Sequence, residues 1–350
     1  MSELRAQWGE GIRTLHPAYF ALVMATGIVS IAAKLLGMTP IAQALLIINL
    51  AAFIILWIVT IIRVVHFPRE VLADLIDHQR GVGFFTAVAA TSVLGSQLVI
   101  LQQSNRIAFA LWIVTLALWL VLIYAVFTAL TVKETKPTLD QGISGGWLVA
   151  VVATESVSTL ASLLAASTQR PDILLFVSLS FWLAGGMLYI WLISLIFYRY
   201  TFFKFSPSDL MPPYWINMGA MAISTLAGTL LIANSALSPL LQRLQPFLLG
   251  FTMFFWATAT WWIPMLLILG FWRHVYKRFP LTYSPLYWGA VFPLGMYSVA
   301  TFRLATVANA PFLLFLPRAF VFIALTAWLV TFIGLVRALI GPMLHRPAAA

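Results

Sequence analysis

Ten apolar stretches, each long enough to cross a bilayer, constrain this chain more than any other feature of its sequence. A membrane-spanning helix needs about 20 mainly apolar residues. Stretches of this kind cover 18–37, 42–65, 82–101, 107–131, 146–166, 173–198, 214–233, 247–271, 286–307 and 316–340. Lipid offers no hydrogen-bond partners, so each stretch must satisfy its own backbone as a helix. We therefore predict an all-α integral membrane protein with ten transmembrane helices. One membrane domain would cover 18–340, between an N-terminal tail (1–17) and a C-terminal tail (341–350).

Composition excludes several functions. Charged residues make up 9% of the chain, whereas soluble domains hold about 25%. The sequence has no cysteine, its five histidines lie at or outside the span ends, and we find no nucleotide-binding or hydrolase motif. We therefore expect no metal, no cofactor and no enzyme activity. The net charge of +10 is dispersed among loops, which argues against a nucleic-acid partner and leaves the lipid bilayer as the expected surroundings.

The distribution of Lys and Arg predicts the orientation. With both termini in the cytoplasm, the cytoplasmic tails and loops hold 14 of the 20 cations, and the other face holds six. Cytoplasmic loops carry an excess of Lys and Arg. We therefore expect both tails to be cytoplasmic, in a multi-pass protein of the inner (cytoplasmic) membrane.

Small residues alternate between successive spans. In one 20-residue window per span, Gly, Ala, Ser and Thr occupy 45 of 100 positions in odd spans and 26 of 100 in even spans. Small residues let helices approach closely. The alternation predicts five helical hairpins with odd helices inside and even helices outside. Ordinary variation in packing is the alternative explanation. Breakers inside odd spans, such as Gly219 and Pro293, also predict kinks there.

Glu155 is the one acidic residue in the middle of an apolar stretch. A charge at that depth costs about 2.5 kcal/mol or more, so Glu155 should face the bundle interior or a water-filled path. Two interpretations remain open. Glu155 is either a proton site or electrostatic valve in a pore, or a structural residue that hydrogen-bonds to Ser or Thr on neighbouring helices.

Three segments resemble one known family. They are His16-Pro17-Ala18-Tyr19-Phe20 with the following Met24-Ala25-Thr26-Gly27, the run Pro213-Tyr214-Trp215-Ile216-Asn217-Met218-Gly219, and Phe292-Pro293-Leu294-Gly295-Met296-Tyr297-Ser298. Together they resemble the tellurite-resistance/dicarboxylate transporter family, which includes bacterial TehA proteins, yeast malate permease, sulfite exporters and the slow anion channels of plant guard cells. The resemblance extends over nearly the whole chain.

The resemblance implies a fold and a gate. Its members arrange five hairpins with pseudo-fivefold symmetry around a central pore lined by odd helices, and they are typically homotrimers. A phenylalanine on the ninth helix closes the pore, and Phe292, beside Pro293, matches it. On periodicity alone, Phe292 is core or lipid-facing filler. Many members have prolines in span 5 where this chain has Val152-Ala153-Thr154-Glu155, so the local pore shape differs there.

Polar residues and glycines of the odd spans are the candidates for lining the pore. They are Thr26, Gly27, Ser30, Thr91, Gly95, Glu155, Ser158, Asn217, Ser224, Thr225 and Ser298. Lys34 and Arg303 would attract anions at the outer ends of spans 1 and 9, or would extend to lipid headgroups. Arg303 follows Phe292 by 11 residues, which places both near one helix face.

These observations predict an anion channel or transporter. Chloride, nitrate, sulfite, tellurite and C4-dicarboxylates such as malate all agree with the resemblance. One alternative is a proton-coupled C4-dicarboxylate carrier with Glu155 as its proton site. A membrane-embedded enzyme is a second alternative, but it would need at least two acid/base or metal-binding residues at one depth, and the sequence offers only Glu155.

Overall fold

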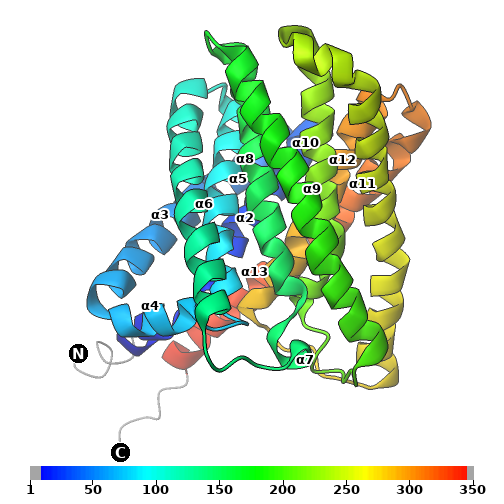
Figure 1. Cartoon of the computed structure of the whole chain (residues 1–350). Coiled ribbons are helices and arrows are strands. Elements are labelled where there is room, and N and C mark those ends of the chain that lie inside the picture. Colours follow the sequence, from blue (N-terminus) through cyan, green and yellow to red (C-terminus); the bar gives the residue numbers. More distant parts are fainter. Residues whose placement is uncertain (1–8, 345–350) are drawn as a thin grey trace, which may run out of the picture.

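The structure is a computed structural model that describes residues 9–344, and nearly all of this part is helical (Figure 1). Ten of its helices are long and apolar enough to cross a membrane. They are α2 (Ala21–Leu35), α3 (Thr39–His66), α5 (Phe85–Gln102), α6 (Asn105–Val132), α8 (Val149–Leu164), α9 (Pro171–Phe202), α10 (Ile216–Ala233), α11 (Pro239–Phe271), α12 (Trp288–Val307) and α13 (Phe315–Leu344). The ten predicted spans are thus confirmed. The largest difference is at α11, which begins eight residues before the predicted 247, because helix formation continues through polar residues that hydropathy excludes.

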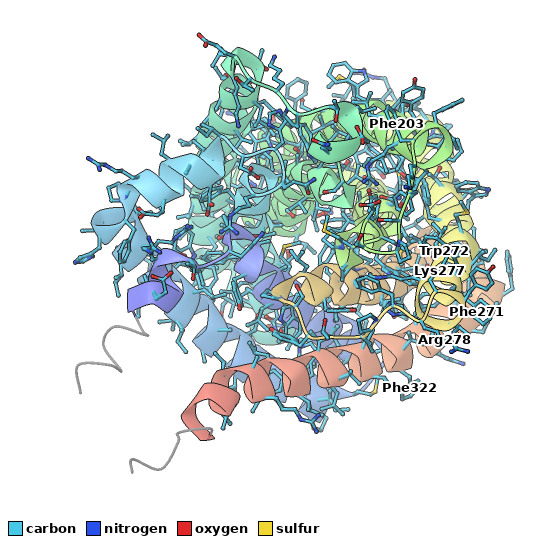
Figure 2. All side chains as sticks on the ribbon, turned by 90° about the horizontal axis from the view of Figure 1, so that it is seen from below. Phe203, Phe271, Trp272, Lys277, Arg278 and Phe322 are labelled. Carbon is cyan, nitrogen blue, oxygen red and sulfur yellow. The ribbon has the colours of Figure 1, made fainter. Side chains whose placement is uncertain are left out.

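The five odd spans (α2, α5, α8, α10 and α12) form a closed ring. Each packs against the next, and α12 packs against α2. Each also pairs with the even helix that follows it. In the most apolar part of each span, 67–94% of the residues are buried in the odd helices and 22–44% in the even helices. The predicted arrangement of odd helices inside and even helices outside is therefore confirmed. Seen from below, exposed side chains such as Phe271 and Phe322 lie on the outer rim of the bundle (Figure 2).

Each odd helix begins with a short 3₁₀ turn at the same end of the bundle. These turns are Pro17–Phe20, Gly81–Phe84, Gly145–Leu148, Pro212–Trp215 and Pro285–Tyr287. Pro is favoured at the start of a helix because its missing N–H would have no partner there. Side chains cap three of the turns, since His16, Ser144 and Ser284 accept hydrogen bonds from backbone N–H groups two residues on. The five hairpins thus share one local design, and α4 (Pro68–Leu75) and α7 (Leu139–Gly142) lie at the same end (Figure 1).

Glycines in the odd helices provide close approach rather than breaks. A Cβ added at Gly219 would lie 2.6 Å from Pro293, and one at Gly145 would lie 2.5 Å from the backbone of Tyr214. α2, α5, α10 and α12 each run as one continuous helix through their glycines and through Pro293, and the predicted kinks within them stay a prediction. Where the missing side chain lets a neighbour pack into a helix, a glycine has no need to break that helix.

Tryptophans of the even helices bond to the odd helix of the next hairpin. Indole N–H groups donate from Trp119 to Thr154, from Trp182 to the carbonyl of Ser224, from Trp256 to Thr301 and from Trp328 to Thr26, at 2.8–3.0 Å. Most even helices therefore cover a seam between two odd helices. Such bonds also satisfy polar groups that lipid cannot.

Candidate functional site

Two cavities lie inside the ring of odd helices, one toward each end. The larger, which we call the amino-terminal cavity, has a volume of about 130 Å³. It is lined by residues of all five odd helices and of the segments that precede them. His16, Thr86, Ser144 and Met211 line it toward the helix starts, and Phe292 lines it deeper inside. The carboxyl-terminal cavity also receives side chains from all five odd helices but measures only about 20 Å³. A cavity needs about 10–15 Å³ to hold one water, so the first has room for several waters and the second for one or two.

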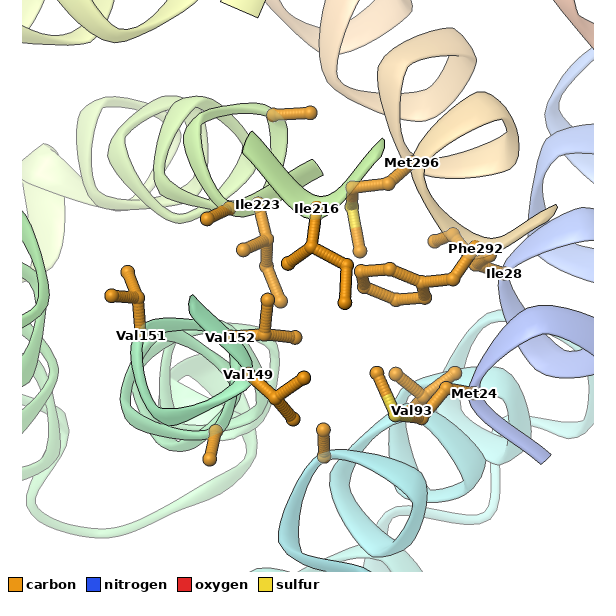
Figure 3. Close-up of a cluster of buried hydrophobic side chains, with 14 of the residues drawn as sticks. Met24, Ile28, Val93, Val149, Val151, Val152, Ile216, Ile223, Phe292 and Met296 are labelled. Carbon is orange, nitrogen blue, oxygen red and sulfur yellow. The ribbon is translucent and has the colours of Figure 1, made fainter. Parts of the chain in front are cut away.

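Phe292 is the deepest residue of α12 that lines the amino-terminal cavity. Phe292 lines the amino-terminal cavity, and Met296, one turn further along α12, lines the carboxyl-terminal cavity. On α8, Val152 lines the amino-terminal cavity, and Ser156, one turn further along, lines the carboxyl-terminal cavity. The Phe292 side chain is 1% exposed. Figure 3 shows its ring pointing from α12 into the middle of the ring of helices, among apolar side chains that include Met24, Val152 and Ile216. An apolar plug therefore separates the two cavities.

The residues that follow Phe292 fix the position of its helix. Pro293 packs on Gly219 of α10, and Gly295 lies against Ile28 and Val29 of α2. Pro293 has no N–H for the carbonyl of Gly289. Because Gly289 lines the amino-terminal cavity, water there can satisfy that carbonyl. Phe292 thus projects from a helix that is tightly packed on both sides.

The starts of the five odd helices meet at the mouth of the amino-terminal cavity. Each of these helix starts has a partial positive charge. Beside them, Asp74 pairs with Arg63 at 2.7 Å and with Arg80 at 2.5 Å. Asp77 accepts the backbone N–H of Arg80, so the two guanidinium groups are balanced by two carboxylates and the helix starts supply the positive potential. Burial opposes ionisation of Asp74, but hydrogen bonds from Arg80 and Arg63 outweigh it and lower its pKa. Burial, followed by the charge of Arg80, lowers the pKa of His16 to about 4. This mouth would attract anions.

Glu155 lies away from both cavities. Its neighbours on α8, Val152, Ser156 and Thr159, line the cavities, but Glu155 does not. Its side chain is fully buried toward Gly185 of α9 and accepts a hydrogen bond from Ser224 of α10 at 3.0 Å. Its second oxygen has no partner among the described residues. The structure therefore corrects the expected pore-facing position and agrees with the interpretation of a carboxyl group held by a hydroxyl of a neighbouring helix.

Most of the other predicted lining residues are at contacts between helices. Ser30 donates to the carbonyl of Ala42, Ser158 bonds to Ser178, and Ser298 donates to the carbonyl of Pro317. The remaining polar members bond within their own helix, to an outer helix or, in the case of Ser224, also to Glu155 of α8, and the glycines touch a neighbouring helix. None of them lines either cavity: Thr26, Gly27, Thr91, Gly95, Asn217, Ser224 and Thr225. This placement corrects the predicted lining. A hydroxyl in a membrane helix is satisfied by a nearby carbonyl, so its presence does not indicate contact with water.

Of the two predicted anion-attracting residues, the structure brings only Arg303 to a cavity. Arg303 lines the carboxyl-terminal cavity with Met296 and Val299, on the stripe of α12 that begins at Phe292. Lys34 lies in the last turn of α2 and lines neither cavity. A cation there complements the negative end of the helix dipole.

Several lining residues were absent from the sequence-based prediction. They include the apolar residues Met24, Val152 and Ile216 at the plug, and the hydroxyl residues Ser92, Ser96, Ser156 and Thr159 of the carboxyl-terminal cavity. Helical spacing could have found part of this set, since residues 152, 156, 159 and 163 of α8 recur at intervals of three and four. Nothing in the sequence, however, distinguishes the face toward the axis from the face toward α9.

The fold and its axial cavities define a multi-pass membrane transport protein with a central path. The chain belongs to the SLAC1 family, described as voltage-dependent anion channel, whose sequence profile matches residues 14–336. The resemblance noted from the sequence is thus confirmed. The family and its named relatives are channels and transporters, not enzymes.

Three relatives show the range of similarity. An uncharacterized membrane protein of Mycobacterium tuberculosis is 37% identical over 162 residues, which cover 46% of this chain and 78% of the relative. An uncharacterized transporter of Methanocaldococcus jannaschii is 25% identical over 298 residues, or 83% of this chain and 84% of its own. A sulfite efflux pump of Trichophyton rubrum is 24% identical over 348 residues, or 92% and 90%.

Proposed function

We propose that this protein conducts small anions through the axis of its odd-helix ring, and that Phe292 closes the path in the form described above. The observation that supports this most is the position of the Phe292 ring between two cavities lined by the same five helices. An apolar constriction excludes water and therefore blocks hydrated ions. The partial positive charges of the five helix starts at the amino-terminal mouth favour anions over cations.

Anion flux into liposomes tests this proposal. Phe292→Ala should raise the flux about tenfold or more, which corresponds to lowering the barrier by about 1.4 kcal/mol. Phe85→Ala is a matched control, because Phe85 is a fully buried phenylalanine of an odd helix that packs on Phe127 of α6 and lines neither cavity. Unchanged flux in a folded Phe292→Ala protein, or an equal rise in Phe85→Ala, would remove Phe292 from the gate.

We further propose small oxyanions as the preferred cargo, with sulfite as the first to test. The support is the similarity to a sulfite efflux pump and the small volume of the carboxyl-terminal cavity. Chloride, nitrate, tellurite and malate belong in the same panel of salts. The proton-coupled dicarboxylate carrier has less support, because Glu155 lines neither cavity.

The remaining parts of the proposal are the homotrimer and the inner membrane with both termini in the cytoplasm. Family resemblance supports the trimer, and the distribution of Lys and Arg supports the orientation. Mass measurement in detergent tests the first. Labelling of single cysteines introduced into loops of this cysteine-free chain tests the second.

A further inference from the structure

We propose that Arg303 and Ser96 form a binding station for a small oxyanion in the carboxyl-terminal cavity, beyond the Phe292 plug. This inference rests on the proposed anion transport and assigns it a second site. Arg303 and Ser96 come from different helices, α12 and α5, and both line this cavity. Arg303 lies 11 residues, or about 16 Å of helix, beyond Phe292 on nearly the same face. An anion that passes the plug therefore enters the space that Arg303 lines.

The charge of Arg303 has no counterion in the described part of the protein. None of the ion pairs includes Arg303, although its side chain is half-buried. No Asp or Glu follows Asp209 in the sequence. At this end of the bundle, the loops and helix ends contain one acid, Asp172 in the first turn of α9, which pairs with Arg170 at 3.3 Å. A partly desolvated guanidinium without a carboxylate is costly unless an anion neutralises it, so the cavity is suited to hold one.

The hydroxyl groups around Arg303 show which donors are free. Ser92 donates to the carbonyl of Ser156, Ser156 to that of Val152, and Thr159 to that of Glu155. Each of these hydroxyls has one proton, and that proton is already used. Ser96 has no hydrogen-bond partner among the described residues, and the same is true of Arg303. The cavity thus offers a guanidinium fork and one free hydroxyl, within walls that are otherwise mainly apolar.

The chemistry of this pair selects the class of ligand. A guanidinium group binds two oxygens of one anion with parallel hydrogen bonds, which fits sulfite or nitrate better than chloride. At about 20 Å³, the cavity has room for one or two waters. A small oxyanion, with four non-hydrogen atoms, therefore requires the cavity to widen far less than a C4-dicarboxylate does.

The test compares variants of Arg303 in two assays. The first is equilibrium binding of labelled sulfite to the purified full-length protein, and the second is sulfite and chloride flux into liposomes. Arg303→Gln should weaken sulfite binding about tenfold or more and raise the half-saturating concentration for flux in parallel. Arg303→Lys keeps the charge but loses the fork, so sulfite affinity should fall severalfold while chloride flux changes little. Arg243→Gln is the control, since Arg243 is exposed at the same end and its loss should leave binding unchanged.

The outcomes separate this station from the proposed function. If the wild type conducts anions but sulfite binds equally well to the wild type and to Arg303→Gln, the station is overturned and anion transport stands. Sulfite binding that depends on Arg303, without flux of any anion, would support the station and overturn the proposed transport. Absence of both sulfite binding and flux in the wild type would overturn both. A loss of sulfite affinity in Arg243→Gln as large as in Arg303→Gln would also overturn the station, because it would reduce the effect to general surface charge.

Discussion

Gly185 and Glu155 should behave as one coupled unit in the packing of α8 against α9. A Cβ added at Gly185 would lie 2.7 Å from Cδ and 2.9 Å from Cγ of Glu155. We expect Gly185→Ala to destabilise the protein by about 1–3 kcal/mol, because the added methyl overpacks a filled site. Glu155→Ala removes the three atoms nearest to the added methyl, but it leaves a cavity and loses the bond from Ser224, at a cost of about 2–4 kcal/mol.

The double variant decides whether this geometry is correct. With Glu155 truncated, the methyl at position 185 fills space instead of clashing, so the double variant should be more stable than the sum of the single effects by at least about 1 kcal/mol. Reversible unfolding in mixed detergent micelles measures the four free energies. Additive effects would refute the contact. Gly250→Ala serves as the control, since a Cβ there meets no atom within 4 Å.

The same geometry predicts the transport behaviour of Glu155→Gln. The amide keeps the size of the side chain and an acceptor for Ser224, and position 155 lines neither cavity. We therefore expect the variant to match wild-type anion flux at every pH. A variant with a much weaker pH dependence, or with abolished transport, would show that Glu155 contacts the transported anion or proton and that its place in the structure is not the functional one.

Two further predictions concern the amino-terminal end of the bundle. Gly145→Ala should be among the most destabilising glycine substitutions, by about 3 kcal/mol or more. The added Cβ would meet the backbone of Tyr214 at 2.5 Å, and a backbone cannot move aside as a side chain can. Thermal unfolding of this variant, compared with that of Gly250→Ala, measures the effect. The pKa of His16 is about 4 in the folded protein, against 6.5 for an ordinary histidine, so the unfolded chain takes up the proton first. The free energy of unfolding should fall by up to about 3 kcal/mol as pH drops from about 6.5 to 4. His16→Asn, which keeps an acceptor for the cap, should lose that part of the pH dependence, and an unchanged pH profile would contradict the assignment.

Hydropathy and composition were enough to predict the ten spans and their radial order. The reason is physical, since the bilayer requires about 20 apolar residues per crossing and small residues permit the close packing of an inner ring. Phe292 and Arg303 could be placed on one face of one helix for a similar reason, because an 11-residue separation is nearly three whole helical turns.

The polar candidates could not be placed in this way. Ser158, Ser298 and Glu155 have the chemistry of pore-lining groups, yet each forms a hydrogen bond with another helix. A single helix is compatible with either orientation of such a residue, and only the packing of α8 against both α9 and α10 turns Glu155 away from the axis. The sequence by itself determined which segments cross the membrane and which lie inside, because solvent and side-chain size act on each segment separately. The tertiary structure alone decided which face of each inner helix meets the path, because that choice depends on contacts among helices far apart in the chain.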